Sequence, residues 1–243
     1  MIDRILLTTV RVGTFEADVP LTNASGFFFE RAKRLYLVTS KHVVFDEASS
    51  HRPDRLEVTV HSDASNLAAS LDVSIPLYDA GLPTWKTATD GGGEIDVAVV
   101  EIDRSALPPS AYFQSFKPKN LPSPADRIDV GSTLLAIGFP MGFHDDLHRL
   151  PVARQAGLAS SSGLPFQGQG YFLVDARTHR GLSGAPIVCK RPTKLGARPA
   201  LPWRLLGVHS ARIDMGTRDP AQDETLGLNA VWYADVLMTL TEK

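Results

Sequence analysis

Three short segments of the sequence carry the residue types that nucleophilic catalysis requires. The segment THRGLSGAPIV places Ser183 between two glycines and ahead of an apolar run. Glycine permits backbone conformations that are closed to other residues, so Gly181 and Gly184 predict a sharp turn that presents the serine. A serine hydroxyl is a weak nucleophile unless a base removes its proton and a third group orients that base. Chemistry at Ser183 therefore needs two partners from elsewhere in the chain.

Two earlier segments supply a candidate base and a candidate orienting acid. In LYLVTSKHVVFD, His42 follows an apolar strand, where its ring can be held still while it faces a cleft. In GGGEIDVAVVEID, Asp96 begins a strand that is too apolar to be exposed. Burying a carboxylate costs free energy unless hydrogen-bond donors surround it, so a donor is expected near Asp96. Asp90 and Asp103 are the alternatives for this acid.

Each motif also has a common structural explanation. A histidine after an apolar strand is usually structural, an aspartate that opens a strand is usually a turn residue, and Gly-x-Ser-Gly is most often only a turn. A nucleophile elbow of the α/β-hydrolase kind is excluded, because that fold places an acid and then the histidine after the serine. His209 is the only histidine beyond Ser183, and no Asp or Glu lies between the two.

Short apolar runs rich in β-branched and aromatic residues recur along the chain, separated by Gly, Pro, Asp and Ser clusters. Their number and spacing predict an all-β barrel or sandwich fold. The predicted strands cover residues 5–12, 25–31, 35–40, 56–60, 72–77, 96–102, 132–139, 152–160, 171–176, 185–190, 203–213 and 226–232. Helical periodicity is convincing only in the last segment, VWYADVLMTLTEK.

Composition limits the function classes. The 243 residues are 43% hydrophobic and 21% charged with a net charge of −2, so no basic surplus favours nucleic acid. The single cysteine, Cys189, excludes an intrachain disulfide framework. We find no signal-peptide pattern at the N-terminus and no apolar run of about 18 residues. We therefore expect a cytoplasmic protein that does not associate with membranes.

The segments VTSKHVV, DVAVV and GLSGAPIV, in that order, resemble the three signature segments of trypsin-like serine peptidases. The resemblance points to the bacterial disulfide-free branches, the high-temperature-requirement proteases and the glutamyl endopeptidase group. VGSTLLAIGFPMG, YFLVDARTHRGLSGAPIV and LLGVHSARI are similar to further strands of these enzymes, and the resemblance covers about residues 20–235. We expect no PDZ domain within this length.

This resemblance implies a chymotrypsin-like fold of two six-stranded antiparallel Greek-key barrels with a short C-terminal helix. We assign residues 1–105 to the N-terminal barrel, which carries the candidate base and acid. Residues 106–127 form a connector, and residues 128–230 form the C-terminal barrel with Ser183. The helix is predicted over residues 231–243.

By the same resemblance, His42 is the general base, Asp96 orients its ring and Ser183 attacks the substrate carbonyl. The backbone N–H groups of Gly181 and Ser183 then form the oxyanion hole. This implies a serine endopeptidase that works through an acyl-enzyme. Leu182 stands where digestive trypsin-like enzymes have an aspartate, so activation by a newly cut N-terminus is not expected. The alternative is a catalytically silent or regulated scaffold that binds peptides without cleaving them.

Specificity rests on a smaller set of residues. Thr178 and His209 fall where the glutamyl endopeptidases carry their own Thr and His, so we hypothesise cleavage after Glu or Asp. The alternative is an ordinary loop threonine and a buried strand histidine. The resemblance also implies that an extended substrate pairs with Ser210, Ala211 and Arg212, although Ala211 and Arg212 depart from the glycine-rich pattern of the family.

No cofactor or metal is expected. The segment GFHDDLHRL carries His144 and His148 at a zinc-like spacing, but we interpret it as a solvated loop beside the cleft. The glycines of TDGGGEID precede Asp96 without a following helix, so they do not predict a phosphate site. The expected partners are polypeptide substrates and a regulatory protein.

Overall fold

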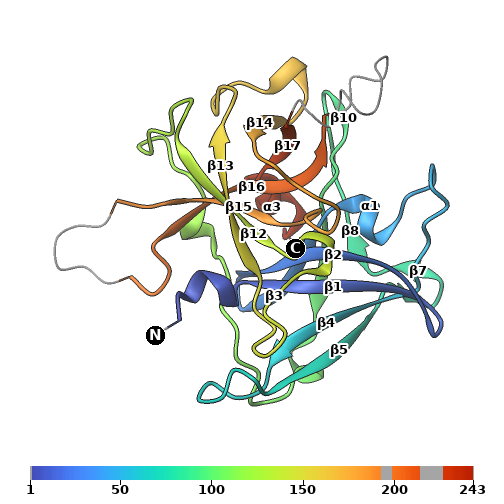
Figure 1. Ribbon diagram of the computed structural model, residues 1–243. Helices are drawn as coiled ribbons and strands as arrows, with labels where there is room; N and C mark the ends of the chain where they lie inside the picture. Colours follow the sequence, from blue (N-terminus) through green and yellow to red (C-terminus); the bar gives the residue numbers. More distant parts are fainter. Residues whose placement is uncertain (1, 193–198, 214–226, 243) are drawn as a thin grey trace.

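Two antiparallel β units make up the protein (Figure 1). The computed structural model describes residues 2–192, 199–213 and 227–242. The N-terminal unit is a seven-stranded sheet in the order β5-β4-β1-β2-β3-β11-β8. Its strands are β1 (Thr9–Glu16), β2 (Val19–Arg31), β3 (Arg34–Thr39), β4 (Arg55–His61), β5 (Ser70–Pro76), β8 (Trp85–Lys86) and β11 (Ala98–Ile102).

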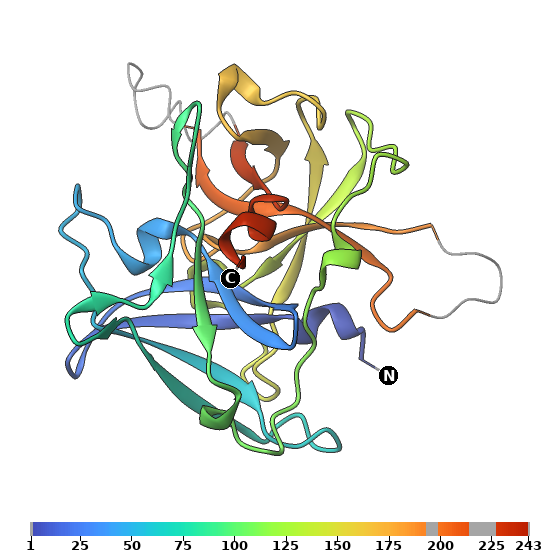
Figure 2. The ribbon, with the colours of Figure 1, turned by 180° about the vertical axis from the view of Figure 1, so that it is seen from behind.

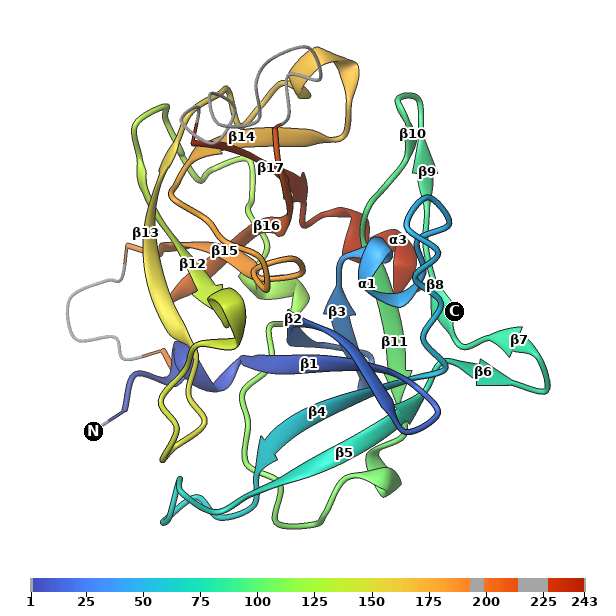
Figure 3. The same cartoon turned by 45° about the vertical axis from the view of Figure 1, so that its right-hand side comes forward.

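The C-terminal unit is a closed six-stranded barrel, in which β15 pairs back onto β12 (Figure 3). Closure leaves this sheet without an unpaired edge strand. The strands, in barrel order, are β12 (Thr133–Gly138), β13 (Val152–Leu158), β14 (Tyr171–Asp175), β17 (Leu228–Tyr233), β16 (Trp203–Arg212) and β15 (Pro186–Lys190).

Short elements connect these strands. Two hairpins, β6 (Tyr78–Asp79) with β7 (Leu82–Pro83) and β9 (Thr89–Asp90) with β10 (Gly93–Glu94), lie between β5 and β11. Among the described residues, the helices are α1 (Lys41–Val44) and α3 (Val236–Leu240), with 3-10 turns η1 (Arg4–Leu7), η2 (Arg104–Ala106), η3 (Pro118–Asn120), η4 (Pro140–Gly142) and η5 (Phe166–Gly168). None of the helices in the described ranges has the length and apolar character to cross a membrane.

The predicted fold class is confirmed, and each predicted strand corresponds to an observed one. Two details differ. The N-terminal unit is a sheet of seven strands, because Trp85–Lys86 adds a short edge strand next to β11. The C-terminal helix begins at Val236 and not at Val231, because Leu228–Tyr233 pairs with β14 and β16 as β17. The first apolar residues of VWYADVLMTLTEK, which predicted a helix, thus belong to β17.

The two units share one hydrophobic core, and alternate side chains of β2 point into it. Phe27 and Phe29 point into a cluster that also contains Leu205 and Trp232 of the barrel, whereas Phe28 points into the separate core of the N-terminal unit. Successive side chains of a strand face opposite sides, so one strand serves both cores. Figure 2 shows α3 between the two units, where Leu237 joins the shared cluster.

We predict that Leu237→Ala destabilises the protein by about 2–5 kcal/mol, because the fully buried side chain leaves a cavity in the shared core. Urea denaturation followed by tryptophan fluorescence measures this effect. Thr239→Ala, on the exposed face of the same helix, is the matched control and should change stability by less than about 0.5 kcal/mol. Equal destabilisation by the two variants would contradict this role of α3.

Candidate active site

His42 lies in the single turn of α1, directly after β3 ends at Thr39. Val43 and Val44, the next two residues of this turn, are buried in the N-terminal core and hold it in place. The ring of His42 is half-buried and lines an open groove that Ser183 also lines. Local sequence therefore places the imidazole as expected, at the end of a buried strand and facing a cleft.

Asp96 precedes β11, and donors from both units surround its carboxylate. Oδ2 accepts a hydrogen bond from His42 Nδ1 at 2.7 Å, and Oδ1 accepts one from the backbone N–H of His42 at 2.9 Å. Ser210 Oγ, from β16 of the barrel, donates to Oδ2 as well. The donors expected for a carboxylate at this depth are thus present.

The two alternative acids have local roles. Asp90 accepts a hydrogen bond from the backbone N–H of Gly92, within the β9–β10 hairpin. Asp103 accepts one from the N–H of Ser105 and caps η2. Both are turn residues, so of the three candidate acids the structure brings Asp96 to His42.

The pKa of His42 reflects two opposing influences. Burial of the ring would lower this pKa, but the hydrogen bond and negative charge of Asp96, with a smaller contribution from Asp46, raise it above 6.5. A carboxylate only accepts hydrogen bonds, so Nδ1 carries the proton that faces Asp96. Nε2 of the neutral ring is then free to accept a proton, as a general base must be.

Ser183 stands in a turn that two left-handed glycines make. Gly181 has a φ of +92° and Gly184 a φ of +82°, a region that favours glycine. The Ser183 side chain is half-buried in the groove, and its Oγ donates to the carbonyl of Ser210 at 3.2 Å. The hydroxyl thus points to β16 in this structure, beside the residue that also holds Asp96.

The amides of Gly181 and Ser183 are available to a substrate oxygen. The carbonyl of Arg180 accepts a hydrogen bond from the N–H of Met141. Because a trans peptide places its N–H opposite its C=O, the N–H of Gly181 points away from Met141. Within the described ranges, neither the Gly181 nor the Ser183 N–H has a protein acceptor. Two unpaired donors next to a nucleophile are what an oxyanion hole requires.

The predicted specificity residues Thr178 and His209 come together through a residue that the sequence analysis missed. Thr178 Oγ1 donates to Asn229 Oδ1, and His209 Nε2 lies 3.4 Å from the same oxygen. Asn229 Nδ2 donates to the carbonyls of Ala176 and Gly227, which fixes the orientation of its amide. The available signal was one polar residue inside the apolar run LGLNAVW.

Burial lowers the pKa of His209 to about 4, so the ring is neutral at pH 7. Its Nδ1 faces the carbonyl of Leu182 at 3.1 Å and must carry the single proton, since a carbonyl cannot donate. Nε2 is then an acceptor that faces the acceptor Oδ1 of Asn229. The neutral ring leaves this second contact unsatisfied.

The remaining predicted residues lie at the end of β16. Ser210 is buried against Asp96, while Ala211 and Arg212 are exposed. The pairing of β16 with β17 is irregular between His209 and Arg212, so this segment departs from the barrel ladder beside the site. In the loop predicted to flank the cleft, His148 Nδ1 pairs with Asp145 at 2.8 Å, and His144 Nε2 lies 3.7 Å from Asp146.

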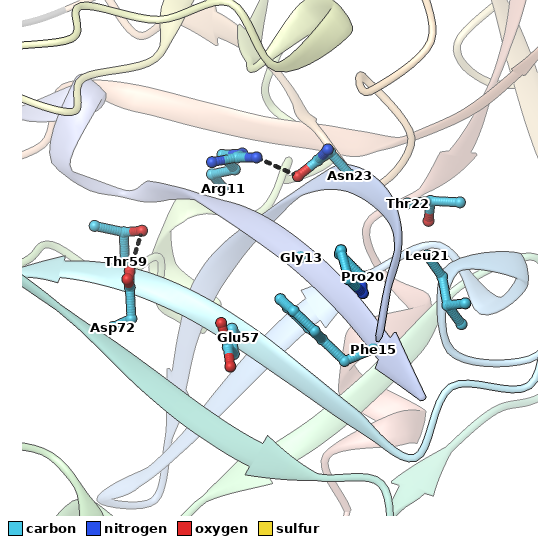
Figure 4. Close-up of a pocket in the computed structure, with 10 residues that line it drawn as sticks. All are labelled: Arg11, Gly13, Phe15, Pro20, Leu21, Thr22, Asn23, Glu57, Thr59 and Asp72. Carbon is cyan, nitrogen blue, oxygen red and sulfur yellow. Dashed lines mark hydrogen bonds between the residues drawn. The ribbon is translucent and has the colours of Figure 1, made fainter. Parts of the chain in front are cut away.

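The groove that His42 and Ser183 share extends along the first half of β2 and the loop after α1. A second, smaller depression lies across β1, β2, β4 and β5, and Figure 4 shows its lining. The two depressions have Pro20–Asn23 in common, so this part of β2 is a wall of both. In the second depression, Arg11 donates to Asn23 Oδ1 across the strand pair.

A two-unit β fold with a groove lined by a serine and by a histidine that an aspartate holds has the architecture of chymotrypsin-like serine peptidases. The trypsin-like peptidase domain matches residues 24–194, more than half of the chain and a range that includes all three residues. The chain therefore belongs to the trypsin-like peptidase family.

Solved structures share this fold. A variant of the HtrA-type protease AlgW with a tripeptide superposes with a TM-score of 0.54 at 15% identity, over 97% of this chain and 59% of that one. The serine endoprotease from Yersinia pestis gives a TM-score of 0.55 at 16% identity, over 97% of this chain and 62% of that one. This chain thus spans about three fifths of the length of these structures. A comparison with curated protein sequences finds no match.

We predict that kcat/KM on a peptide substrate falls with decreasing pH through a pKa above 6.5, because protonated His42 cannot accept the serine proton. Asp96→Asn removes the charge that raises this pKa, so the acidic limb should move to lower pH and kcat should fall by about 10⁴-fold. Initial rates between pH 5 and 9 measure both effects. A limb that Asp96→Asn leaves in place would contradict the assignment of the pKa to His42.

Proposed function

We propose that the protein is a serine endopeptidase that hydrolyses peptide bonds through an acyl-enzyme. The observation that carries this proposal is the ordered pair His42–Asp96 beside Ser183, in a groove that also presents two unpaired amide donors. Family membership supports the same reaction and implies polypeptide substrates.

The proposed mechanism begins with a small rotation of Ser183. Its Oγ leaves the carbonyl of Ser210 and transfers its proton to His42 Nε2 as it bonds to the substrate carbonyl carbon. The carbonyl electron pair moves to the oxygen, where the N–H groups of Gly181 and Ser183 stabilise the negative charge. The C–N bond then breaks while His42 returns the proton to the leaving amine. Water then attacks the carbonyl carbon of the acyl-enzyme and gives its proton to His42. The bond to Ser183 Oγ breaks as His42 returns this proton to Oγ, and the acid product is released.

We predict that the wild-type protein reacts with a fluorophosphonate probe, in which Ser183 Oγ displaces fluoride from phosphorus. Ser183→Ala should abolish this labelling, because it removes the hydroxyl that lines the groove together with His42. Intact-protein mass spectrometry measures the adduct. Ser162→Ala is the control: its hydroxyl donates to the Ile128 carbonyl, outside the groove, and labelling should persist. Undiminished labelling of Ser183→Ala would refute the assignment.

The second candidate function is a scaffold that binds peptides without cleaving them. The hydrogen bond of Ser183 Oγ to Ser210 favours it, because this rotamer directs the nucleophile to β16. The probe distinguishes the two functions: a scaffold locked in this state would remain unlabelled as wild type, whereas a peptidase would be labelled.

We also propose that the site prefers substrates with Glu, and secondarily Asp, before the scissile bond. The support is the buried group of Thr178, His209 and Asn229 beneath the nucleophile turn. A carboxylate next to this group would favour the imidazolium form of His209, which can donate from both nitrogens. Its second proton would satisfy Asn229, and Thr178 Oγ1 would turn to the substrate.

We predict that a substrate with Glu before the scissile bond is cleaved about 10- to 150-fold faster, by kcat/KM, than its Gln counterpart, as for one or two charge-assisted hydrogen bonds. Thr178→Val should reduce this ratio, whereas Thr241→Val, a buried threonine in the last turn of the chain, should not. Profiling with a peptide library measures the preference. A preference for Ala, Val or Leu at this position would overturn the proposal.

A further inference from the structure

Ser25, on β2 of the N-terminal unit, forms most of its hydrogen bonds with the other unit. The residue is fully buried. Its Oγ donates to the carbonyl of Gly181 at 2.7 Å and accepts from the N–H of Phe139 at 3.0 Å. Its backbone N–H donates to the carbonyl of Ser183 at 2.9 Å. One residue of the first unit thus contacts three backbone groups around the nucleophile turn of the second.

Two glycines leave space for Ser25. A Cβ added to Gly184 would lie 2.2 Å from the carbonyl oxygen of Ser25, and one added to Gly138 would lie 2.5 Å from Ser25 Oγ. Only glycine fits at these two positions without moving backbone or a buried hydroxyl. Thr39 Oγ1 donates to the same carbonyl oxygen of Ser25 at 2.9 Å, so each polar group of the serine has a partner.

The strand that carries Ser25 is itself well held. Its first half pairs with β1 from Val19 to Phe27, apart from one irregularity at Thr14/Phe15. Figure 4 shows the cross-strand hydrogen bond between Arg11 and Asn23, two residues before Ser25. The serine hydroxyl is therefore presented from a paired strand and not from a loop.

Gly181 is the residue that most needs such support. Its N–H must point into the groove to serve as an oxyanion donor, yet glycine adopts positive and negative φ with similar ease. The peptide bond before Gly181 is held by the Arg180 carbonyl bonded to Met141, and the peptide bond after it by the Gly181 carbonyl bonded to Ser25. Ser25 also holds Phe139, which leads into η4 and Met141. Ser25 thus supports both restraints on Gly181, one directly through the Gly181 carbonyl and the other indirectly through Phe139.

We propose that Ser25 is a positioning residue for the oxyanion hole: its hydroxyl locks the two peptide planes around Gly181 and so keeps the Gly181 N–H in the groove. This inference rests on the proposed peptidase function. The oxyanion exists only in the transition state and tetrahedral intermediate, so loss of this restraint lowers kcat and leaves substrate binding nearly unchanged.

The test is Ser25→Ala, assayed with a peptide substrate and with a peptide aldehyde that forms a tetrahedral adduct with the serine. We expect kcat to fall about 10- to 100-fold, less than the 10²–10³-fold for deletion of a donor itself, with KM within about twofold. The affinity for the aldehyde should fall in parallel with kcat. Thr8→Val is the matched control, because it removes a fully buried hydroxyl that bonds to Ile5 and Thr9, away from the nucleophile turn. It should leave both quantities unchanged.

Ser25→Cys is the second variant, for the case in which Ser25→Ala does not fold. A thiol keeps the shape of the side chain but is a weak donor, so its kcat should lie below that of the wild type with KM unchanged. A wild-type kcat and aldehyde affinity in either folded variant would overturn the role of Ser25 alone. A wild-type protein that reacts with neither fluorophosphonate nor aldehyde would overturn the proposed function, and this inference with it.

Discussion

The arrangement of the site depends on one half-buried carboxylate that both units must satisfy. Asp96 accepts two hydrogen bonds from His42 and one from Ser210, which belongs to the barrel. A buried carboxylate without donors would be costly, so the position of β16 relative to α1 is tied to the charge of Asp96. Ser210 also accepts the hydrogen bond of Ser183, so the acid and the nucleophile both bond to one residue of β16.

A second set of hydrogen bonds joins the same units at the nucleophile turn. Ser25 on β2 bonds to the backbone of Gly181, Ser183 and Phe139, where Gly138 and Gly184 leave no side chain in its way. The shared apolar cluster also joins the two units, and β2 contributes Phe27 and Phe29 to it. The two walls of the groove are therefore not independent, because hydrogen bonds between the units and a common hydrophobic core hold them together.

The buried group of Thr178, His209 and Asn229 contains one unsatisfied hydrogen-bond contact. His209 meets two acceptors with one proton, and Asn229 cannot rotate to relieve this because two carbonyls hold its amide. Burial keeps the ring neutral nonetheless, and its pKa is about 4. An anion placed next to this group would favour the protonated ring, which can donate from both nitrogens.

The sequence by itself determined the strands, the all-β class and the candidates His42 and Ser183, because each depends on local patterns: apolar alternation, a histidine after an apolar strand and a glycine-flanked turn. The grouping of these two residues with Asp96 came from the resemblance to trypsin-like peptidases. Local patterns could not separate Asp96 from Asp90 and Asp103, nor the C-terminal helix from the strand before it, since long-range pairing decides both. Ser25 and Asn229 carried no motif of their own. Their roles exist only because the tertiary structure brings β2 and β17 to the nucleophile turn, and hydrogen bonds between residues more than 50 positions apart leave no local pattern in a sequence.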